Sequence, residues 1–219
     1  MFKPINNVIK VLIASDVLLI TGFGFISPII AIFISQKITL GDASEAAKIA
    51  GFAMAIYWGV KSFLEIPIGN YLDKNHGEKD DLIFAMIGNS LAAISAFLYI
   101  FSNQPWHIYL LEIIYSAGMA MNIPAWTAMF TRHIDKGQEA FEWASRSTFI
   151  GIGAAAAGAL GGLIASNFGF NFLFVTVGVF SLFSSLVLFL ILKAVSPRDK
   201  VTPRTPEVKT FQEPYLPKE

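Results

Sequence analysis

The chain has 219 residues, of which 54% are hydrophobic and 20 are Phe, and its mean hydropathy is +0.58. It is far more apolar than a soluble domain of this length needs to be, so a membrane protein is the first expectation. Sixteen basic and sixteen acidic residues cancel, which argues against nucleic acid as a partner. The sequence contains no cysteine, which excludes disulfides, thiolate metal sites and a cysteine nucleophile.

Six apolar runs follow one another along the chain, each close to the ~20 residues that a helix needs to cross about 30 Å of hydrocarbon. The third and sixth runs contain no charged side chain, whereas the first, second and fourth each contain some. The pattern predicts an all-α membrane protein with six transmembrane helices, surrounded by a lipid bilayer. The predicted helices cover about residues 11–34, 49–72, 82–101, 106–130, 147–166 and 170–192.

The two ends of the chain are interpreted separately from the helices. The first run is too long for a secretory signal, contains Asp16 and lacks a small-residue cleavage site, so we expect a retained helix. Residues 196–219 hold five of the ten prolines and show no apolar periodicity. The composition therefore predicts a transmembrane domain over residues 1–195 and a disordered, Pro-rich cytoplasmic tail over residues 196–219.

The basic residues between the runs are distributed unequally over the two sides of the membrane. An N-terminus in the cytoplasm leaves only Lys37 and Lys48 outside. Because cytoplasmic segments carry an excess of Lys and Arg, both termini are predicted to be cytoplasmic, in a multi-pass protein of the plasma (inner) membrane. Besides those of the tail, the basic residues placed inside are Lys3, Lys10, Lys74, Lys79, Arg132, Lys136, Arg146 and Lys193.

The turn between the second and third predicted helices has the sequence GNYLDKNHGEK, residues 69–79. It resembles the signature loop of the major facilitator superfamily (MFS), in which Gly, Asp, a basic residue, Gly and further basic residues recur. Gly77 comes one residue later than the family spacing, and Glu78 stands where a basic residue is usual. Glycines permit a tight turn, and Asp73 can cap a helix start. The matching residues are Gly69, Asp73, Lys74, Gly77 and Lys79.

A second resemblance to the same superfamily covers the fourth to sixth helices. It is carried by GMAMNIPAWTAMF (118–130) and by STFIGIGAAAAGALGGLIASNFGFNFLF (147–174), which is similar to the Gly-rich fifth helix and the Gly-aromatic turn. Ala154, Gly158 and Gly162 lie at i, i+4 and i+8, a stripe that lets another backbone pack close, although general helix packing explains the stripe equally well. Together the resemblances imply the six-helix N-terminal half of a twelve-helix transporter.

The first and fourth helices share a spacing that predicts an internal repeat. Residues 16–28 (DVLLITGFGFISP) and 112–124 (EIIYSAGMAMNIP) both begin with an acid, followed by Gly six residues on and Pro six residues later. Facilitator halves consist of two three-helix units of inverted topology. We therefore expect two inverted three-helix repeats, half of an MFS transporter fold. Pro28 and Pro124 are expected to bend their helices.

Four ionisable residues lie well inside the predicted helices: Asp16, Lys61, Glu65 and Glu112. Each charge costs about 2.5 to 3.5 kcal/mol at a helix centre, so it should face a cavity or a partner. Lys61 and Glu65 are four residues apart on one helix face, as in a structural ion pair. The alternative is that they line a central cavity with Asp16, where burial favours the protonated carboxyl that proton coupling requires.

Two further alternatives stay open for these acids. Asp16 can be a simple partner of Lys61, and Glu112 can be a hydrogen-bonded acid near the outer surface. In resembling transporters, the charged link between the fourth and fifth helices forms salt links with the signature-loop Asp, which implies contact of Asp73 with Arg132 or Arg146 in one conformation. A solvated link is the alternative there.

No GxxxxGK[ST] phosphate loop is present, which argues against an ATP-driven pump. The three His residues are far apart in the sequence, so no metal site, cofactor or enzymatic activity is expected. The resemblance implies instead a half-size secondary transporter that moves a small-molecule solute by alternating access, with proton coupling left open. Candidate substrate contacts lie near the aligned prolines, although packing explains them equally well: Ser27, Asn122, Trp126 and Thr127.

The expected oligomer follows from the half-size architecture. Two copies with both termini inside would reproduce the twelve-helix arrangement about an axis along the membrane normal, so a homodimer is predicted. One alternative is that the chain pairs with a separately encoded C-terminal half. Another is a non-transporting six-helix scaffold that binds a partner, for which the Pro-rich tail is a candidate surface.

Overall fold

The computed structural model describes residues 5–75 and 77–195, and every regular element in this part of the chain is a helix. Two features named from the sequence, Lys3 and the Pro-rich tail, lie outside the described residues. The elements are α1 (Asn7–Ile26), α2 (Ile30–Phe33), the π-helical turn η1 (Ile34–Ile38), α3 (Ala43–Asn75), α4 (Glu78–Leu98), the 3₁₀ turn η2 (Tyr99–Phe101), α5 (Pro105–His133), α6 (Glu139–Leu188) and the 3₁₀ turn η3 (Phe189–Ile191).

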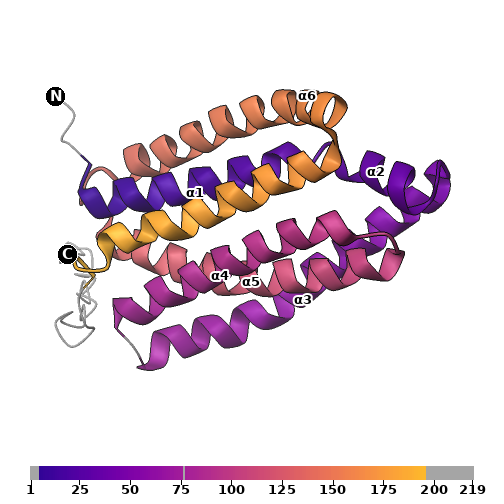
Figure 1. Cartoon of the computed structure of the whole chain (residues 1–219). Helices are drawn as coiled ribbons and strands as arrows, with labels where there is room; N and C mark the ends of the chain where they lie inside the picture. Colours follow the sequence, from indigo (N-terminus) through magenta and orange to yellow (C-terminus); the bar gives the residue numbers. More distant parts are fainter. Residues whose placement is uncertain (1–4, 76, 196–219) are drawn as a thin grey trace, which may run out of the picture.

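The longest element, α6, reverses its direction at Gly169, and its two arms lie side by side with α1 in Figure 1. Gly169 has φ 81° and ψ 170°, a backbone conformation that glycine adopts without the steric cost of a side chain. A straight helix of its 50 residues would be about 75 Å long, far more than a bilayer accommodates. The reversal therefore divides α6 into two arms, residues 139–168 and 170–188.

The two prolines aligned from the sequence have different effects. α1 ends at Ile26, and Ser27 to Ile29 form a turn before α2 begins, because Pro28 has no N–H to continue the helix. Pro124 lies inside α5, which continues to His133. The first predicted helix, 11–34, is therefore interrupted, whereas the fourth is continuous.

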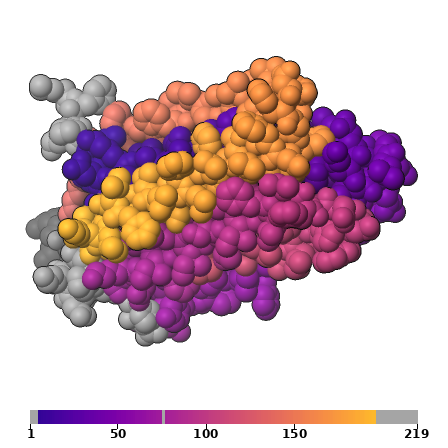
Figure 2. Space-filling model, in the orientation of Figure 1, coloured from indigo at the N-terminus to yellow at the C-terminus, as the bar shows by residue number. Residues whose placement is uncertain are grey.

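The helices form one bundle in which the most extensive contacts join α1 to α6, α4 to α5, α3 to α5 and α4 to α6. In the space-filling view, α4 and the second arm of α6 form one continuous face (Figure 2). Helices from the first three predicted spans thus pack on helices from the last three. The inverted relation between the two halves stays a prediction.

Five helices within the described residues are long and apolar enough to cross a membrane, and the turn at Gly169 divides the longest of them. Large apolar side chains remain exposed around the bundle, among them Phe63 at 79% and Ile66 at 72% on α3. An exposed apolar belt of this kind is expected of a protein whose solvent is lipid. The chain is an integral, multi-pass, all-α membrane protein.

Small residues bring α1 and the first arm of α6 together. A Cβ added at Gly161 would meet the carbonyl group of Phe25, and Ala157 lies against Gly24. The contact stripe within the chain is therefore Gly153, Ala157 and Gly161. Of the stripe chosen from the sequence, Ala154, Gly158 and Gly162, only the backbone of Ala154 also lies against Gly24. Gly158 and Gly162 have open space where a Cβ would be, because the first arm of α6 turns a neighbouring face toward α1.

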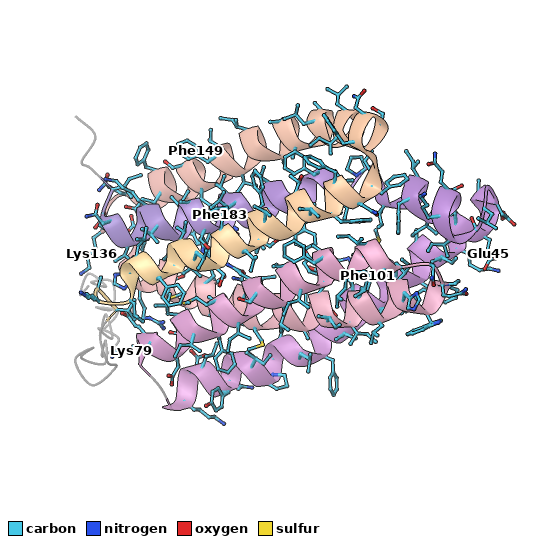
Figure 3. The ribbon with its side chains drawn as sticks, viewed as in Figure 1. Glu45, Lys79, Phe101, Lys136, Phe149 and Phe183 are labelled. Atoms are coloured by element: carbon cyan, nitrogen blue, oxygen red, sulfur yellow. The ribbon has the colours of Figure 1, made fainter. Side chains whose placement is uncertain are left out.

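Charged residues mark the two ends of the bundle. Lys79 and Lys136 lie at one end in Figure 3, and Glu45 lies at the other. α1 begins and η3 ends at the first of these ends, and Ile9, Leu12, Leu188 and Ile191 form a buried apolar cluster there. The end that carries Lys79 is the one that the basic residues predict to be cytoplasmic, and it is called the lysine end below.

The different surroundings of Gly161 and Gly158 allow a test with two matched substitutions. Gly161→Ala places a methyl group against the Phe25 carbonyl, and such overpacking costs about 1 to 3 kcal/mol, more than the gain of up to about 1 kcal/mol in helix propensity. Gly158→Ala gains propensity without a contact. Thermal unfolding in detergent should therefore show a lowered midpoint for Gly161→Ala and an equal or raised one for Gly158→Ala. Equal losses for both would contradict the assigned stripe.

Candidate functional site

A cavity of about 340 Å³ lies between α1, α3 and α5, in the half of the bundle away from the lysine end. It reaches the surface beside Met54 and Trp58, which are 65% and 55% exposed. The other lining residues are Phe23, Ile26, Ser27, Ile30, Ile34, Ala50, Ala53, Tyr57, Tyr99, Glu112 and Tyr115.

Helical periodicity explains why these residues share one space. On α5, Glu112 and Tyr115 are three residues apart and therefore lie on the same face. The residues from α1 and α3 follow the same spacing of three and four, and Ala50 and Ala53 occupy little volume on the α3 side. Three helix faces thus converge on a space that small side chains leave unfilled.

Aromatic rings form a continuous wall of the cavity. Phe23 stacks on Tyr115 with 4.2 Å between ring centroids, and Tyr115 stacks on Tyr57 at 5.3 Å. Trp58 meets Tyr57 edge-on at 5.2 Å. The four rings come from α1, α3 and α5, so the wall also fixes the relative positions of these helices.

Glu112 is the one acidic residue among those that line the cavity, and its Oε1 accepts a hydrogen bond of 2.7 Å from the Tyr99 hydroxyl. Lys61 and Glu65, one and two turns further along α3 from Tyr57, form the predicted ion pair, with 2.7 Å between Nζ and Oε2. The Lys61 ammonium also lies 5.3 Å from the centre of the Trp58 ring. Glu112 therefore has a neutral partner, whereas the charge of Lys61 is balanced by Glu65.

Asp16 is bound by a residue that the sequence analysis had placed in the link after the fourth helix. Arg146 lies on α6, and its Nε and Nη2 donate to Asp16 Oδ2 at 2.7 and 2.6 Å. The guanidinium lies 4.6 Å from the centre of the Trp126 ring, whose Nε1 donates to the Leu12 carbonyl at 3.0 Å. Arg146, rather than Lys61, is thus the partner of Asp16. Because α6 begins at Glu139, Arg146 lies within this helix, which packs on α1, and not in the link before it.

Asn122 lies in a buried polar network near the middle of the bundle. Its Nδ2 donates to Asn89 Oδ1 at 2.7 Å, and Asn89 Nδ2 donates to Ser184 Oγ at 2.8 Å. Ser184 and Ser15 each donate a hydroxyl to the other's carbonyl, at 2.7 and 2.9 Å. The network joins α5, α4, α6 and α1, so Asn122 holds helices together and does not line the cavity.

The signature-loop residues lie at the lysine end. Arg132 Nε donates to Glu78 Oε1 at 3.2 Å, its Nη2 binds Asp81, and His133 Nε2 lies 3.2 Å from Glu78 Oε2. Glu78, the departure from the family pattern, thus joins α5 to the start of α4 together with Asp81. Asp73 does not cap a helix start, because it lies in the last turn of α3 and Gly77 is the N-cap of α4.

Two other cavities are lined in part by residues that were singled out from the sequence. One, of about 370 Å³ at the lysine end, is lined by Gly69, Asp73, Thr127 and Arg132 among others, so Asp73 and Arg132 border the same space. The second, about 610 Å³ beside the reversal of α6, is lined in part by Lys37 and Gly162. This second cavity lies at the helix ends. We take the 340 Å³ cavity as the candidate site because the aromatic wall and Glu112 line it.

The structure thus brings only some of the predicted site residues together. Ser27 and Glu112 meet at the cavity, whereas Asp16, Lys61 and Glu65 lie outside its lining, as do Asn122, Trp126 and Thr127. The sequence reasoning missed the tyrosines and Trp58. The available signal was helical spacing: Tyr115 is three residues from Glu112 on α5, and Tyr57 is four residues from Ala53 on α3.

The fold and the site together define a multi-pass helical membrane protein with a solute-sized cavity inside its bundle. A comparison with known families matches residues 12–216 to the Major Facilitator Superfamily, and the chain belongs to this family. It is a transporter of the major facilitator type. A comparison with curated proteins finds no match.

The buried pair between α1 and α6 generates a prediction. Asp16→Asn leaves the Arg146 guanidinium without its counter-charge in an apolar bundle, and breaking such a pair costs about 3 to 5 kcal/mol. Because Arg146 is 27% exposed, we expect the lower part of this range. Thermal unfolding in detergent should show a large drop for Asp16→Asn and a smaller one for Asp16→Asn/Arg146→Gln. Additive losses in this double-mutant cycle would mean that the pair contributes nothing.

Proposed function

We propose that the protein is a secondary transporter that moves a small solute by alternating access, and that the cavity between α1, α3 and α5 holds the solute. The observation that carries the proposal is the cavity itself, with one carboxylate among aromatic walls in a helix long enough to cross a membrane. Small-molecule sites are concave and mostly apolar, with few polar groups that fix orientation. This cavity has that composition.

The arrangement along the bundle axis supports alternating access. At 1.5 Å per residue, Asp16 lies about 14 Å along α1 from Asn7, and Phe23 at the cavity lies about 24 Å along it. An ion pair at the lysine end joins α4 to α5, and the Asp16–Arg146 pair joins α1 to α6 nearer the middle of the bundle, whereas the cavity lies beyond both. The ion pairs thus lie between the candidate cavity and the lysine end, which is what one state of an alternating carrier requires.

The working unit that we propose is a homodimer. The cavity reaches the surface at Met54 and Trp58 of α3, and the same helix exposes Phe63 and Ile66. A second copy against α3 would supply the missing wall. Two six-span units about an axis along the membrane normal also build the full facilitator architecture.

If transport is coupled to protons, Glu112 is the residue that we assign to coupling. Of the four ionisable residues predicted inside the membrane, it alone lines the cavity, and its hydrogen-bond partner Tyr99 is neutral. Asp16 is bound by Arg146 and Glu65 by Lys61, so a proton on either acid would break an ion pair.

The chain contains no cysteine, so single cysteines report accessibility without background. Ser27→Cys, at the cavity, should react with a membrane-impermeant maleimide from either side, in right-side-out and in inverted vesicles, because access alternates. Ser184→Cys, which is fully buried in the polar network, is the matched control and should react from neither side. Reaction of Ser27→Cys from one side only under all conditions would contradict alternating access.

The homodimer is tested by counting subunits. Stepwise photobleaching of a labelled chain at limiting density in a lipid bilayer should give two steps. A single step would remove the homodimer and direct the search to a partner chain that covers α3.

A further inference from the structure

We infer that the cavity between α1, α3 and α5 selects an amphipathic organic cation, a quaternary or tertiary ammonium that carries apolar groups. The inference rests on the proposed function, because it names the class of solute that the same cavity holds. It is carried by the charge, the aromatic walls and the hydrogen bonds of the residues that line the space.

The charge of the lining favours a cation. Glu112 lines the cavity, and none of the described residues that line it is basic. The Lys61 ammonium, which lies 5.3 Å from the centre of the Trp58 ring, is 2.7 Å from Glu65, so these two charges cancel. An anion would meet the Glu112 carboxylate with no compensating cation, and a neutral solute would leave that carboxylate unpaired on binding.

The walls offer aromatic faces to the same solute. Phe23, Tyr57, Trp58 and Tyr115 form one connected group of rings at the cavity. A cation within about 6 Å of an aromatic face is attracted by the negative charge density of that face, and quaternary ammonium groups are the ligands that aromatic cages recognise. Apolar groups on the solute would pack against the same rings and against Ile26, Ile30 and Ile34.

The chain itself places cations against such rings. The Lys61 ammonium lies 5.3 Å from the centre of the Trp58 ring at the rim of the cavity. On α6, the Arg146 guanidinium is held both by a carboxylate and by the Trp126 ring at 4.6 Å. A carboxylate combined with an aromatic face is therefore a cation environment that this fold already uses.

The hydrogen bonds suggest a cation with few N–H groups. The Tyr99 hydroxyl donates to Glu112, which uses one acceptor site of that carboxylate. A primary ammonium has three N–H donors to satisfy, whereas a quaternary ammonium has none. Among side chains that line the cavity, Glu112 is the one charged acceptor, and the hydroxyls of Ser27 and the tyrosines are neutral acceptors. A bulky, poorly hydrated cation fits this lining best.

The test uses the full chain in nanodiscs and a pair of probes of opposite charge, benzyltrimethylammonium and phenylmethanesulfonate. Isothermal titration calorimetry, with empty nanodiscs as the blank, should detect binding of the cation and none of the anion. Glu112→Gln should weaken cation binding by at least about tenfold, as expected for the loss of a charged partner. Trp58→Leu should weaken it by about fivefold.

Two controls keep the result interpretable. Glu45→Gln removes an exposed carboxylate toward the same end of the bundle that does not line the cavity, and this variant should bind the cation as the unmodified chain does. Glu112→Asp keeps the charge and should recover most of the affinity lost in Glu112→Gln. Equal binding of the two probes, or cation binding that Glu112→Gln leaves unchanged, would overturn the inference.

Protection of Ser27→Cys separates failure of this inference from failure of the proposed function. Benzyltrimethylammonium should slow maleimide reaction at Ser27→Cys, whereas phenylmethanesulfonate should not. If Ser27→Cys reacts from both sides and neither probe protects it, the cation class is wrong and the alternating cavity stands. If it reacts from neither side, the cavity is not a transport site and both proposals fail.

Discussion

The structure depends on the ion pair that joins Asp16 of α1 to Arg146 of α6 inside an apolar bundle. Two hydrogen bonds of 2.6 and 2.7 Å connect the groups, and the Trp126 ring covers the guanidinium. The Asp16 side chain is buried and that of Arg146 is 27% exposed, and an unpaired charge on either is costly among apolar helices. The pair therefore fixes the register of α1 against α6, the most extensive helix contact in the fold.

Other features extend this constraint along the bundle axis. Beyond the pair, hydroxyls and amides of Ser15, Asn89, Asn122 and Ser184 bond one another across four helices. Interhelical polar bonds and small residues hold membrane bundles together where no hydrophobic effect acts between helices. Further along, large rings and small alanines leave a cavity that contains Glu112. Ion pairs and polar groups thus join the helices in the lysine-end half and the middle of the bundle, and the candidate cavity lies toward the other end.

Part of this organisation could be predicted from the sequence, and there are physical reasons why the rest could not. Long apolar runs and the basic loops are strong signals, so the helical membrane fold and the family were within reach. The Lys61–Glu65 pair also follows from spacing within one helix. The Asp16–Arg146 pair joins residues 130 positions apart, and no spacing rule connects them.

The errors in the predicted site have related causes. Ala157 and Gly158 belong to adjacent stripes of small residues with the same spacing, so the sequence alone could not say which stripe faces α1. Asn122 and Trp126 lie one turn apart near Pro124, yet both turn toward other helices rather than the cavity. Aromatic residues are so frequent in this chain that the helical spacing of Tyr57 and Tyr115 did not distinguish them until three helix faces were placed together.

The central claim is that the Asp16–Arg146 pair keeps the lysine end shut while the cavity is accessible from the other end. The most direct test is the rate at which an impermeant maleimide reaches Ser27→Cys from the lysine end, compared with and without Arg146→Gln. The account predicts faster reaction from the lysine end, and slower reaction from the opposite end, once the pair is broken. Unchanged rates from both ends in a folded Arg146→Gln variant would contradict it.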